Sequence, residues 1–139
     1  MPANVFQFIH RVTYAECTAG NHVYYSRYLD ILEAARGEFF RHLGAPLLQW
    51  QERQIIFPVI ECRVRYHAPA RYDDTLTVEL HPAVKGIRLN FASHVINQTG
   101  ACIIEAETFH VCTGLDEKPR RIPEELVRLL QPYLAAAEK

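Results

Sequence analysis

The sequence lacks several features that mark specialised classes of protein. Its 15 lysine and arginine residues and 16 aspartate and glutamate residues leave a net charge of −1, so no overall positive field exists to hold a nucleic-acid backbone. No apolar run approaches the roughly 18 residues of a membrane span, and the first ten residues lack the basic start and apolar core of a secretory signal. We therefore expect no nucleic-acid partner, no membrane span and a cytoplasmic location.

Cysteine is present, but without any clustered pattern. Cys17, Cys62, Cys102 and Cys112 stand singly in apolar or strand-like segments, and none has the CxxC spacing that metal sites and redox motifs favour. Cys17 also has no pairing base at a recognisable spacing, so a nucleophilic role is not expected for it. We expect free and mostly buried thiols, with no metal site and no cofactor.

What the chain does have is the patterning of an α+β protein. Its length of 139 residues, 49% of them hydrophobic, fits a single domain over residues 1–139. Alternating side chains predict a first strand over Val5–Tyr14, and spacings of three and four predict a long helix over Val23–Leu43 and a short one over Pro123–Ala137. Four further strands, separated by turn signals, are predicted at Ile55–His67, Thr75–Val84, Arg88–Asn97 and Ala101–Cys112.

The long helix is expected to lie at the centre of the fold. It carries Leu29, Ile31 and Phe40 outside its main apolar stripe, which indicates that most of its circumference is covered. The segment 45–54 that follows has no clear period. One curved antiparallel sheet wrapped around one buried helix is the simplest packing that hides such a helix.

Three segments carry a resemblance to a known family. They are YAECTAGNHVYYSRYLDILEAAR (14–36), VRYHAPARYDD (64–74) and EAETFHVCTGLDEKPRRIP (105–123). Together they resemble the 4-hydroxybenzoyl-CoA thioesterase-like family of acyl-CoA thioesterases, which includes the bacterial thioesterases associated with the Tol-Pal cluster. The resemblance implies a hot-dog fold and the hydrolysis of an acyl-CoA or acyl-carrier-protein thioester to a carboxylic acid and a thiol. It also implies that coenzyme A or phosphopantetheine is part of the substrate, and that a homodimer or homotetramer forms its sites between subunits.

The first segment resembles the active-site loop of that family. The family's catalytic Asp, a nucleophile or general base, falls on Thr18, the Asp two residues earlier falls on Glu16, the family's Gly on Asn21 and a frequent His on His22. A threonine hydroxyl is not a base at neutral pH, and some relatives that act on carrier-protein thioesters also lack this Asp. We therefore expect Thr18 to hold the water or the carbonyl, assisted by His22 or Glu16, with the backbone N–H of Tyr25 as oxyanion donor by resemblance.

Each of these side chains also has a structural interpretation. If the loop is extended, Glu16 shares a face with Thr18 and reaches the same water, but it is otherwise an exposed or salt-bridged carboxylate. His22 either binds substrate or makes a structural hydrogen bond in the loop. Glu33, on the long helix, matches an acidic position of relatives and is either catalytic or buried as a pair with Arg36.

Basic residues late in the chain are candidates for contacts with phosphate groups. KPRR (118–121) places three positive charges in four residues of an otherwise neutral protein, a clustering that suits the nucleotide end of coenzyme A. The candidate substrate-binding residues are Lys85, Arg88, Lys118, Arg120 and Arg121.

Two other functions stay open at this stage. One is a hot-dog dehydratase or hydratase acting on 3-hydroxyacyl thioesters, which would need His22 and a carboxylate as an acid–base pair. The other is a non-catalytic protein that binds acyl thioesters, a hypothesis supported by the threonine at position 18.

Overall fold

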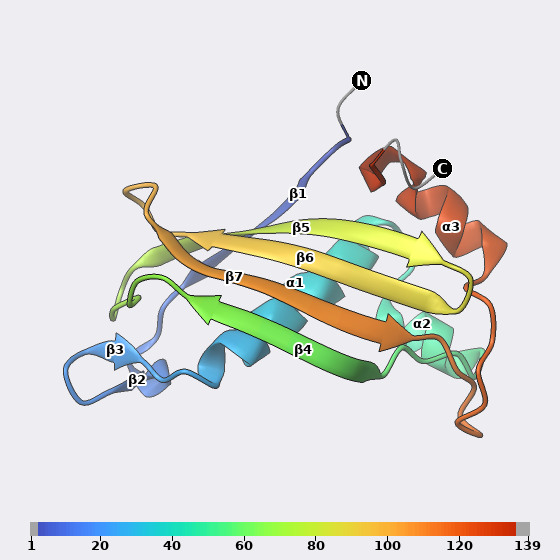
Figure 1. Cartoon of the computed structure of the whole chain (residues 1–139), viewed down its shortest axis with the longest axis horizontal. Helices are drawn as coiled ribbons and strands as arrows, with labels where there is room; N and C mark the ends of the chain where they lie inside the picture. Colours follow the sequence, from blue (N-terminus) through green and yellow to red (C-terminus); the bar gives the residue numbers. More distant parts are fainter. Residues whose placement is uncertain (1–2, 136–139) are drawn as a thin grey trace.

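A five-stranded antiparallel sheet curves around one long helix in the computed structural model, which describes residues 3–135 (Figure 1). The strand order is β1-β5-β6-β7-β4, so β1 and β4 are the edges. The strands are β1 (Phe6–Arg11), β4 (Val59–Tyr66), β5 (Thr75–Lys85), β6 (Arg88–Ile96) and β7 (Cys102–Val111). The predicted curved antiparallel sheet around a helix is therefore confirmed.

The remaining elements are short, apart from the central helix. A separate two-stranded hairpin, β2 (Cys17–Thr18) and β3 (His22–Val23), precedes this helix. The helices are α1 (Arg27–His42), α2 (Leu47–Glu52) and α3 (Glu124–Leu130), and single 3₁₀ turns occupy η1 (Tyr14–Glu16) and η2 (Gln131–Tyr133).

Several predicted boundaries are wrong for local reasons. The first strand ends at Arg11 because Tyr14–Glu16 coils into a 3₁₀ turn, and the long helix begins at Arg27 because His22–Val23 pairs with β2. The last helix gives way to a 3₁₀ turn at Gln131–Tyr133, and its predicted end at Ala137 lies outside the described residues. The helix α2 was missed; its buried Trp50 anchors it, with the indole N–H donating to the carbonyl of Ala45 at 3.0 Å.

The core lies between the inner face of the sheet and one side of α1. Phe39 is fully buried, and its ring lies 5.1 Å from that of Phe6, 6.1 Å from Phe91 and 5.0 Å from Tyr133, measured between centroids. Along β6 alternate residues face this core, as the period of a strand requires.

The other side of α1 is open in the single chain. Leu29 is 42% exposed, and Glu33 and Glu38 are also exposed. The expectation that most of the helix circumference is covered is therefore wrong for one chain taken alone. The uncovered side of α1 is mixed in character, because it carries the apolar Leu29 beside the carboxylates of Glu33 and Glu38.

The two ends of the sheet carry different groups. At one end Tyr66 pairs with Ile104, close to the β2–β3 hairpin and the start of α1. At the other end Lys85 pairs with Arg88, and β7 leads into the segment that holds KPRR (Figure 1). The ten residues of β7 separate these ends by roughly 30 Å.

Candidate functional site

The β2–β3 hairpin brings together Thr18 and His22. These residues are direct cross-strand partners, so their side chains lie on the same face of the hairpin, and both are exposed. Between them Gly20 (φ 83°) and Asn21 (φ 60°) have left-handed backbone conformations, and asparagine is among the few residues other than glycine that tolerate one. The Asn21 side-chain oxygen also accepts a hydrogen bond from the N–H of Tyr72 at 3.1 Å, which anchors the turn.

The carboxylate of Glu16 is bound by neighbouring residues and does not point toward Thr18 along an extended loop. Its carboxylate interacts with Nε2 of His10 at 2.9 Å, and it accepts hydrogen bonds from the N–H of Thr13 at 2.7 Å and the Thr13 hydroxyl at 3.1 Å. The premise of an extended loop is wrong, because Glu16 closes a 3₁₀ turn. Its side chain is 14% exposed and hydrogen-bonded to His10 and Thr13, which favours the structural interpretation of this residue.

These contacts set the pH dependence expected of Glu16. Burial raises its pKa, but the hydrogen bond from the Thr13 backbone and then the His10 contacts outweigh burial, so the pKa lies below its ordinary value. A carboxylate whose pKa is lower in the folded than in the unfolded protein stabilises the fold at pH values above its pKa in the unfolded protein. This stabilisation is lost as the pH falls through its pKa in the folded protein.

We expect Glu16→Gln to lower the free energy of unfolding by about 1 kcal/mol at pH 7, because charge-assisted hydrogen bonds are weakened. Urea titrations of both proteins should show this difference shrinking as the pH falls below about 4.3, the ordinary pKa of glutamate. A difference that is the same at pH 7 and pH 3 would contradict the stabilising role of the ionised carboxylate.

The start of α1 presents a free backbone donor. Among the hydrogen bonds of residues 3–135, none uses the N–H of Tyr25, and the Ser26 side chain does not cap the helix. The N–H of the preceding Tyr24 is bound to the carbonyl of Glu16 at 2.9 Å, which ties the loop to the helix start. A free amide at the positive end of a 16-residue helix is suited to bind an oxyanion.

Tyr66 helps to hold that helix start in place. Its hydroxyl donates to the carbonyl of Tyr25 at 2.9 Å. Burial, and then the neighbouring Cys62 and Tyr25, raises the pKa of Tyr66, so the group remains a neutral hydroxyl and a donor at pH 7.

Two cavities meet the hairpin. One, of about 290 Å³, is lined by groups from the hairpin, the helix start and the end of β4, including His22, Tyr25, Tyr28, Tyr66 and His67. The other, of about 550 Å³, is lined by loop residues around Thr18 together with Tyr72. Thr18 and His22 are therefore cross-strand neighbours, but Thr18 lines the larger cavity and His22 lines the smaller one.

Glu33 lies apart from this group. It is six residues into α1 from Arg27, about 9 Å along the helix axis, and it lines a separate apolar cavity of about 80 Å³ with Arg36 and His110. Arg36 is 9% exposed, and burial lowers its pKa, although the charge of Glu33 acts in the opposite direction. The alternative of a buried pair is wrong in this chain, because Glu33 is exposed and, in the described part of the chain, no ion pair joins it to Arg36.

The candidate phosphate-binding residues lie at the opposite end of the sheet. Lys85 and Arg88 flank the β5–β6 turn, and Arg121 lines a cavity of about 440 Å³ with Arg128 of α3. The Arg120 guanidinium folds over Gly114 and lies beside the carboxylate of Asp116, where a Cβ on Gly114 would come within 2.6 Å of it. Lys118 is exposed in the same turn. Within one chain this cluster does not reach Thr18.

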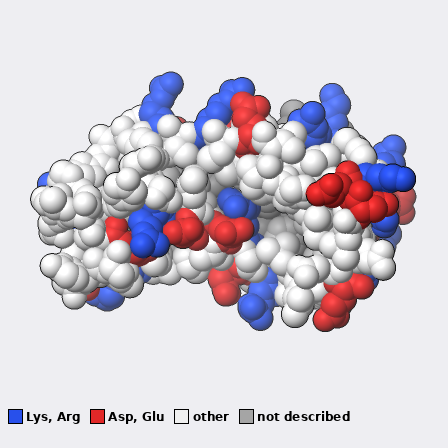
Figure 2. All heavy atoms as spheres, turned by 90° about the horizontal axis from the view of Figure 1, so that it is seen from below, with Lys and Arg blue, Asp and Glu red and all other residues white. Residues whose placement is uncertain are grey.

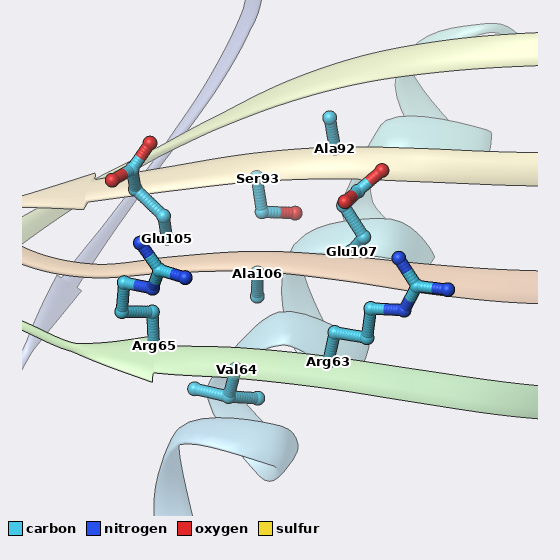
Figure 3. Close-up of a pocket in the computed structure, with 8 residues that line it drawn as sticks. All are labelled: Arg63, Val64, Arg65, Ala92, Ser93, Glu105, Ala106 and Glu107. Atoms are coloured by element: carbon cyan, nitrogen blue, oxygen red, sulfur yellow. The ribbon is translucent and has the colours of Figure 1, made fainter.

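The outer face of the sheet holds a hollow of about 460 Å³ with a different character. Arg63 and Arg65 of β4 stand beside Glu107 and Glu105 of β7 across the strand pair (Figure 3). Figure 2 shows how charge is distributed on the molecule seen from below. The end with the β2–β3 hairpin is mostly uncharged, whereas charged residues gather over the middle and the opposite end. The outer hollow lies on the far side of the sheet from α1, so the helix-start donor does not face it.

The cysteines are free, as predicted, but they are less buried than predicted. Cys112 is buried, Cys17 and Cys102 are half-buried, and Cys62 is exposed on β4. Cys62 is exposed because β4 is an edge strand, whose inner face is only partly covered in a single chain.

Sequence reasoning missed Tyr66 and His67 as cavity residues. They lie in the second of the segments that carry the family resemblance, but their hydrogen-bond partners are 41 and 38 residues away along the chain. The structural role of Glu16 did have a sequence signal, because Thr13 and Glu16 have the spacing of a capping box.

Comparison with known proteins identifies the family of the chain. Residues 12–130 match the profile of the Thioesterase-like superfamily. The chain is 33% identical over 129 residues to "Acyl-CoA thioester hydrolase YbgC" of Escherichia coli O6:H1, covering 91% of this chain and 96% of that protein. It is 33% identical over 126 residues to "Acyl-CoA thioesterase YbgC" of Haemophilus influenzae, covering 88% and 92%.

A solved structure extends the likeness to three dimensions. The hypothetical protein TT1821 from Thermus thermophilus superposes with a TM-score of 0.84 at 32% identity, over 91% of this chain and 98% of that one. In residues 3–135 no helix has both the length and the apolar character to cross a membrane.

Proposed function

The chain belongs to the thioesterase-like superfamily and hydrolyses acyl thioesters on a hot-dog fold, and we propose that it does so with the β2–β3 hairpin and the start of α1. The substrate class that its relatives indicate is an acyl-CoA, with an acyl-carrier-protein thioester as the alternative carrier. No cofactor is needed, because coenzyme A or phosphopantetheine arrives as part of the substrate. A cytoplasmic location remains a prediction from the sequence.

The observation that supports this mechanism is the unused N–H of Tyr25, which lines the same cavity as His22, the cross-strand partner of Thr18. Acyl transfer requires a donor aimed at the oxygen where negative charge develops, and a fixed backbone amide at a helix start supplies one without reorganisation. Glu16 is held by His10 and Thr13, so His22 is the group left to handle protons at the hairpin.

The steps then follow from these groups. The N–H of Tyr25 donates to the thioester carbonyl oxygen, and the Thr18 hydroxyl holds a water against the carbonyl carbon. The imidazole of His22 accepts a proton from that water as the water oxygen bonds to the carbon. The carbon–sulfur bond then breaks, the thiolate takes the proton from His22, and the products are a carboxylic acid and a thiol.

We propose that a second copy of the chain completes the site. β4 is an edge strand with exposed apolar side chains, among them Val59 (48% exposed) and Ile60 (50% exposed). Unpaired edges of this kind favour strand pairing, and a symmetric dimer pairs β4 with its own copy in the antiparallel direction. The Tyr66 end of one β4 then lies beside the Val59 end of the other.

This dimer accounts for the distance, within one chain, between the basic residues of the segment 118–121 and Thr18. Val59 pairs with His110 near the exit of β7, which leads to Lys118, Arg120 and Arg121. The cluster of the second copy is thereby brought toward the Thr18 end of the first. A homodimer is the smallest assembly with a complete site, and a homotetramer contains two such dimers.

Binding of the nucleotide end of coenzyme A is tested by Arg121→Ala. We expect KM for an acyl-CoA to rise about tenfold with kcat nearly unchanged, because a remote phosphate contact acts equally on ground and transition states. Arg120→Ala is the matched comparison, since its guanidinium already lies over Gly114 beside Asp116. A variant that carries both Arg120→Ala and Arg121→Ala completes the test. If its KM equals that of the wild type at fixed ionic strength, the phosphates bind elsewhere or the carrier is not coenzyme A.

The dehydratase alternative is separated by its products. A 3-hydroxyacyl-CoA incubated with the enzyme should yield free thiol and 3-hydroxy acid, with no enoyl thioester detected by mass spectrometry. An enoyl product without thiol release would favour the dehydratase. The position of Glu16 argues against that chemistry, because the carboxylate needed as a partner for His22 is bound to His10 and Thr13.

A further inference from the structure

An irregularity in β7 gathers three metal-binding side chains at one end of the outer face. Residues three apart in a regular strand point to opposite faces, which would separate Cys102 from Glu105. In this sheet Val95 pairs with Ile104 and Ile96 pairs with Cys102, so Ile103 is an extra, bulged residue. The bulge restores both side chains to the same face, and His67 reaches them from just beyond the end of β4.

The ligand atoms of this cluster are already close together. One donor atom each from His67, Cys102 and Glu105 lies within 4.8 Å of the others, and His67 Nε2 is 2.7 Å from the Glu105 carboxylate. Tetrahedral zinc with bonds of about 2.0–2.3 Å separates its ligands by about 3.5 Å. The side chains of His67 (36% exposed) and Glu105 (61% exposed) are free to make this small adjustment.

We propose that His67, Cys102 and Glu105 form a binding site for a divalent transition-metal ion of the zinc type. Imidazole, thiolate and carboxylate are the three ligand types that zinc accepts, and their mixture disfavours magnesium or calcium, which take oxygen ligands. Three protein ligands leave a fourth position for water. This site goes beyond the proposed hydrolysis and does not depend on it.

The surrounding charges modulate this site. Glu105 lies directly between His94 of β6 and Arg65 of β4 in the strand register. Figure 3 shows the Arg65 guanidinium on the same side of the sheet as the Glu105 carboxylate. The permanent positive charge of Arg65, the cross-strand neighbour of Glu105, opposes a bound cation, so removal of Arg65 should strengthen metal binding.

The test is a titration of the intact protein with Co²⁺, followed by displacement with Zn²⁺. Cobalt bound through a thiolate gives a charge-transfer absorption in the near ultraviolet, which reports Cys102 without any measurement of activity. We expect a saturable band at one ion per chain. Cys102→Ala should abolish it, and Glu105→Gln should weaken binding about tenfold. Because Glu105 is exposed, its replacement should leave the fold intact by circular dichroism.

Two control variants make the assignment specific. Cys62→Ser, which removes the exposed thiol of β4, should leave the band unchanged, and Arg65→Gln should lower the Kd about threefold, because a competing charge is lost. The proposal is overturned if the wild type shows no saturable thiolate band, if the band survives in Cys102→Ala, or if Cys62→Ser removes it. Thiol release from an acyl-CoA is a separate readout, so failure of the metal site leaves the hydrolytic function untouched.

Discussion

Replacing Thr18 by alanine is expected to lower kcat by at least about tenfold, and by up to about a hundredfold, because it removes a positioned hydrogen-bonding group from the reacting water. Thr18 is exposed at the end of a two-residue strand, where a change to alanine alone costs little stability. The rate of thiol release at saturating acyl-CoA measures the effect, and circular dichroism confirms the fold. A large loss of kcat without loss of structure identifies a catalytic residue.

Neighbouring variants show which group acts on the water. Thr18→Asp restores the residue typical of the family and should retain or raise kcat, since a carboxylate at this position is a base. His22→Ala should lower kcat, whereas Glu16→Gln should act mainly on stability. If Thr18→Ala keeps the wild-type kcat while Glu33→Gln abolishes it, the base lies on α1 and the hairpin mechanism is wrong.

Cys62→Asp is expected to separate the dimer and to reduce activity by on the order of a hundredfold or more, because like charges that face each other across paired strands repel. Cys62 is near the middle of β4, so two copies paired about a two-fold axis bring these positions together. Sedimentation measures the assembly state and thiol release measures the activity. Cys62→Ser is the isosteric control, and it should stay dimeric. A folded monomer with full activity would contradict a shared site.

Subunit mixing tests sharing of the site in a second way. A mixed dimer of Thr18→Ala and Arg121→Ala chains contains one site with both changes and one site with neither, if each site takes its loop and its basic cluster from different copies. Mixing should therefore restore part of the wild-type kcat/KM. No recovery after exchange of subunits would place both groups of a site in the same chain.

Much of the fold was predictable because its signals are local. Alternation along β5, β6 and β7 reports which face is buried, and the predicted strands agree with the structure within one or two residues there. The start of α1 was harder to predict. Val23 was predicted to begin the helix, but it pairs with Cys17 of β2 instead, and this pairing depends on the turn at Gly20 and Asn21.

The candidate site was less predictable because it depends on contacts between distant segments. The Tyr66 hydroxyl reaches the Tyr25 carbonyl only after β4 is paired with β7, and the Cys102 side chain turns outward only because Ile103 bulges. Neither the hydrogen bond nor the bulge produces a periodic pattern of apolar residues in the sequence. The catalytic roles of Thr18, His22 and the N–H of Tyr25 remain predictions that the kinetic experiments test.

The most direct measurement is the release of thiol by the wild-type protein from a panel of acyl-CoA and acyl-carrier-protein thioesters, run beside Thr18→Ala. Hydrolysis at the hairpin predicts saturable release of thiol with an equal amount of free carboxylic acid, and a clear loss of kcat in the variant. A wild-type rate indistinguishable from the uncatalysed background for every thioester, in a protein that nevertheless binds them, would contradict hydrolysis at the hairpin and identify a non-catalytic acyl-thioester binding protein.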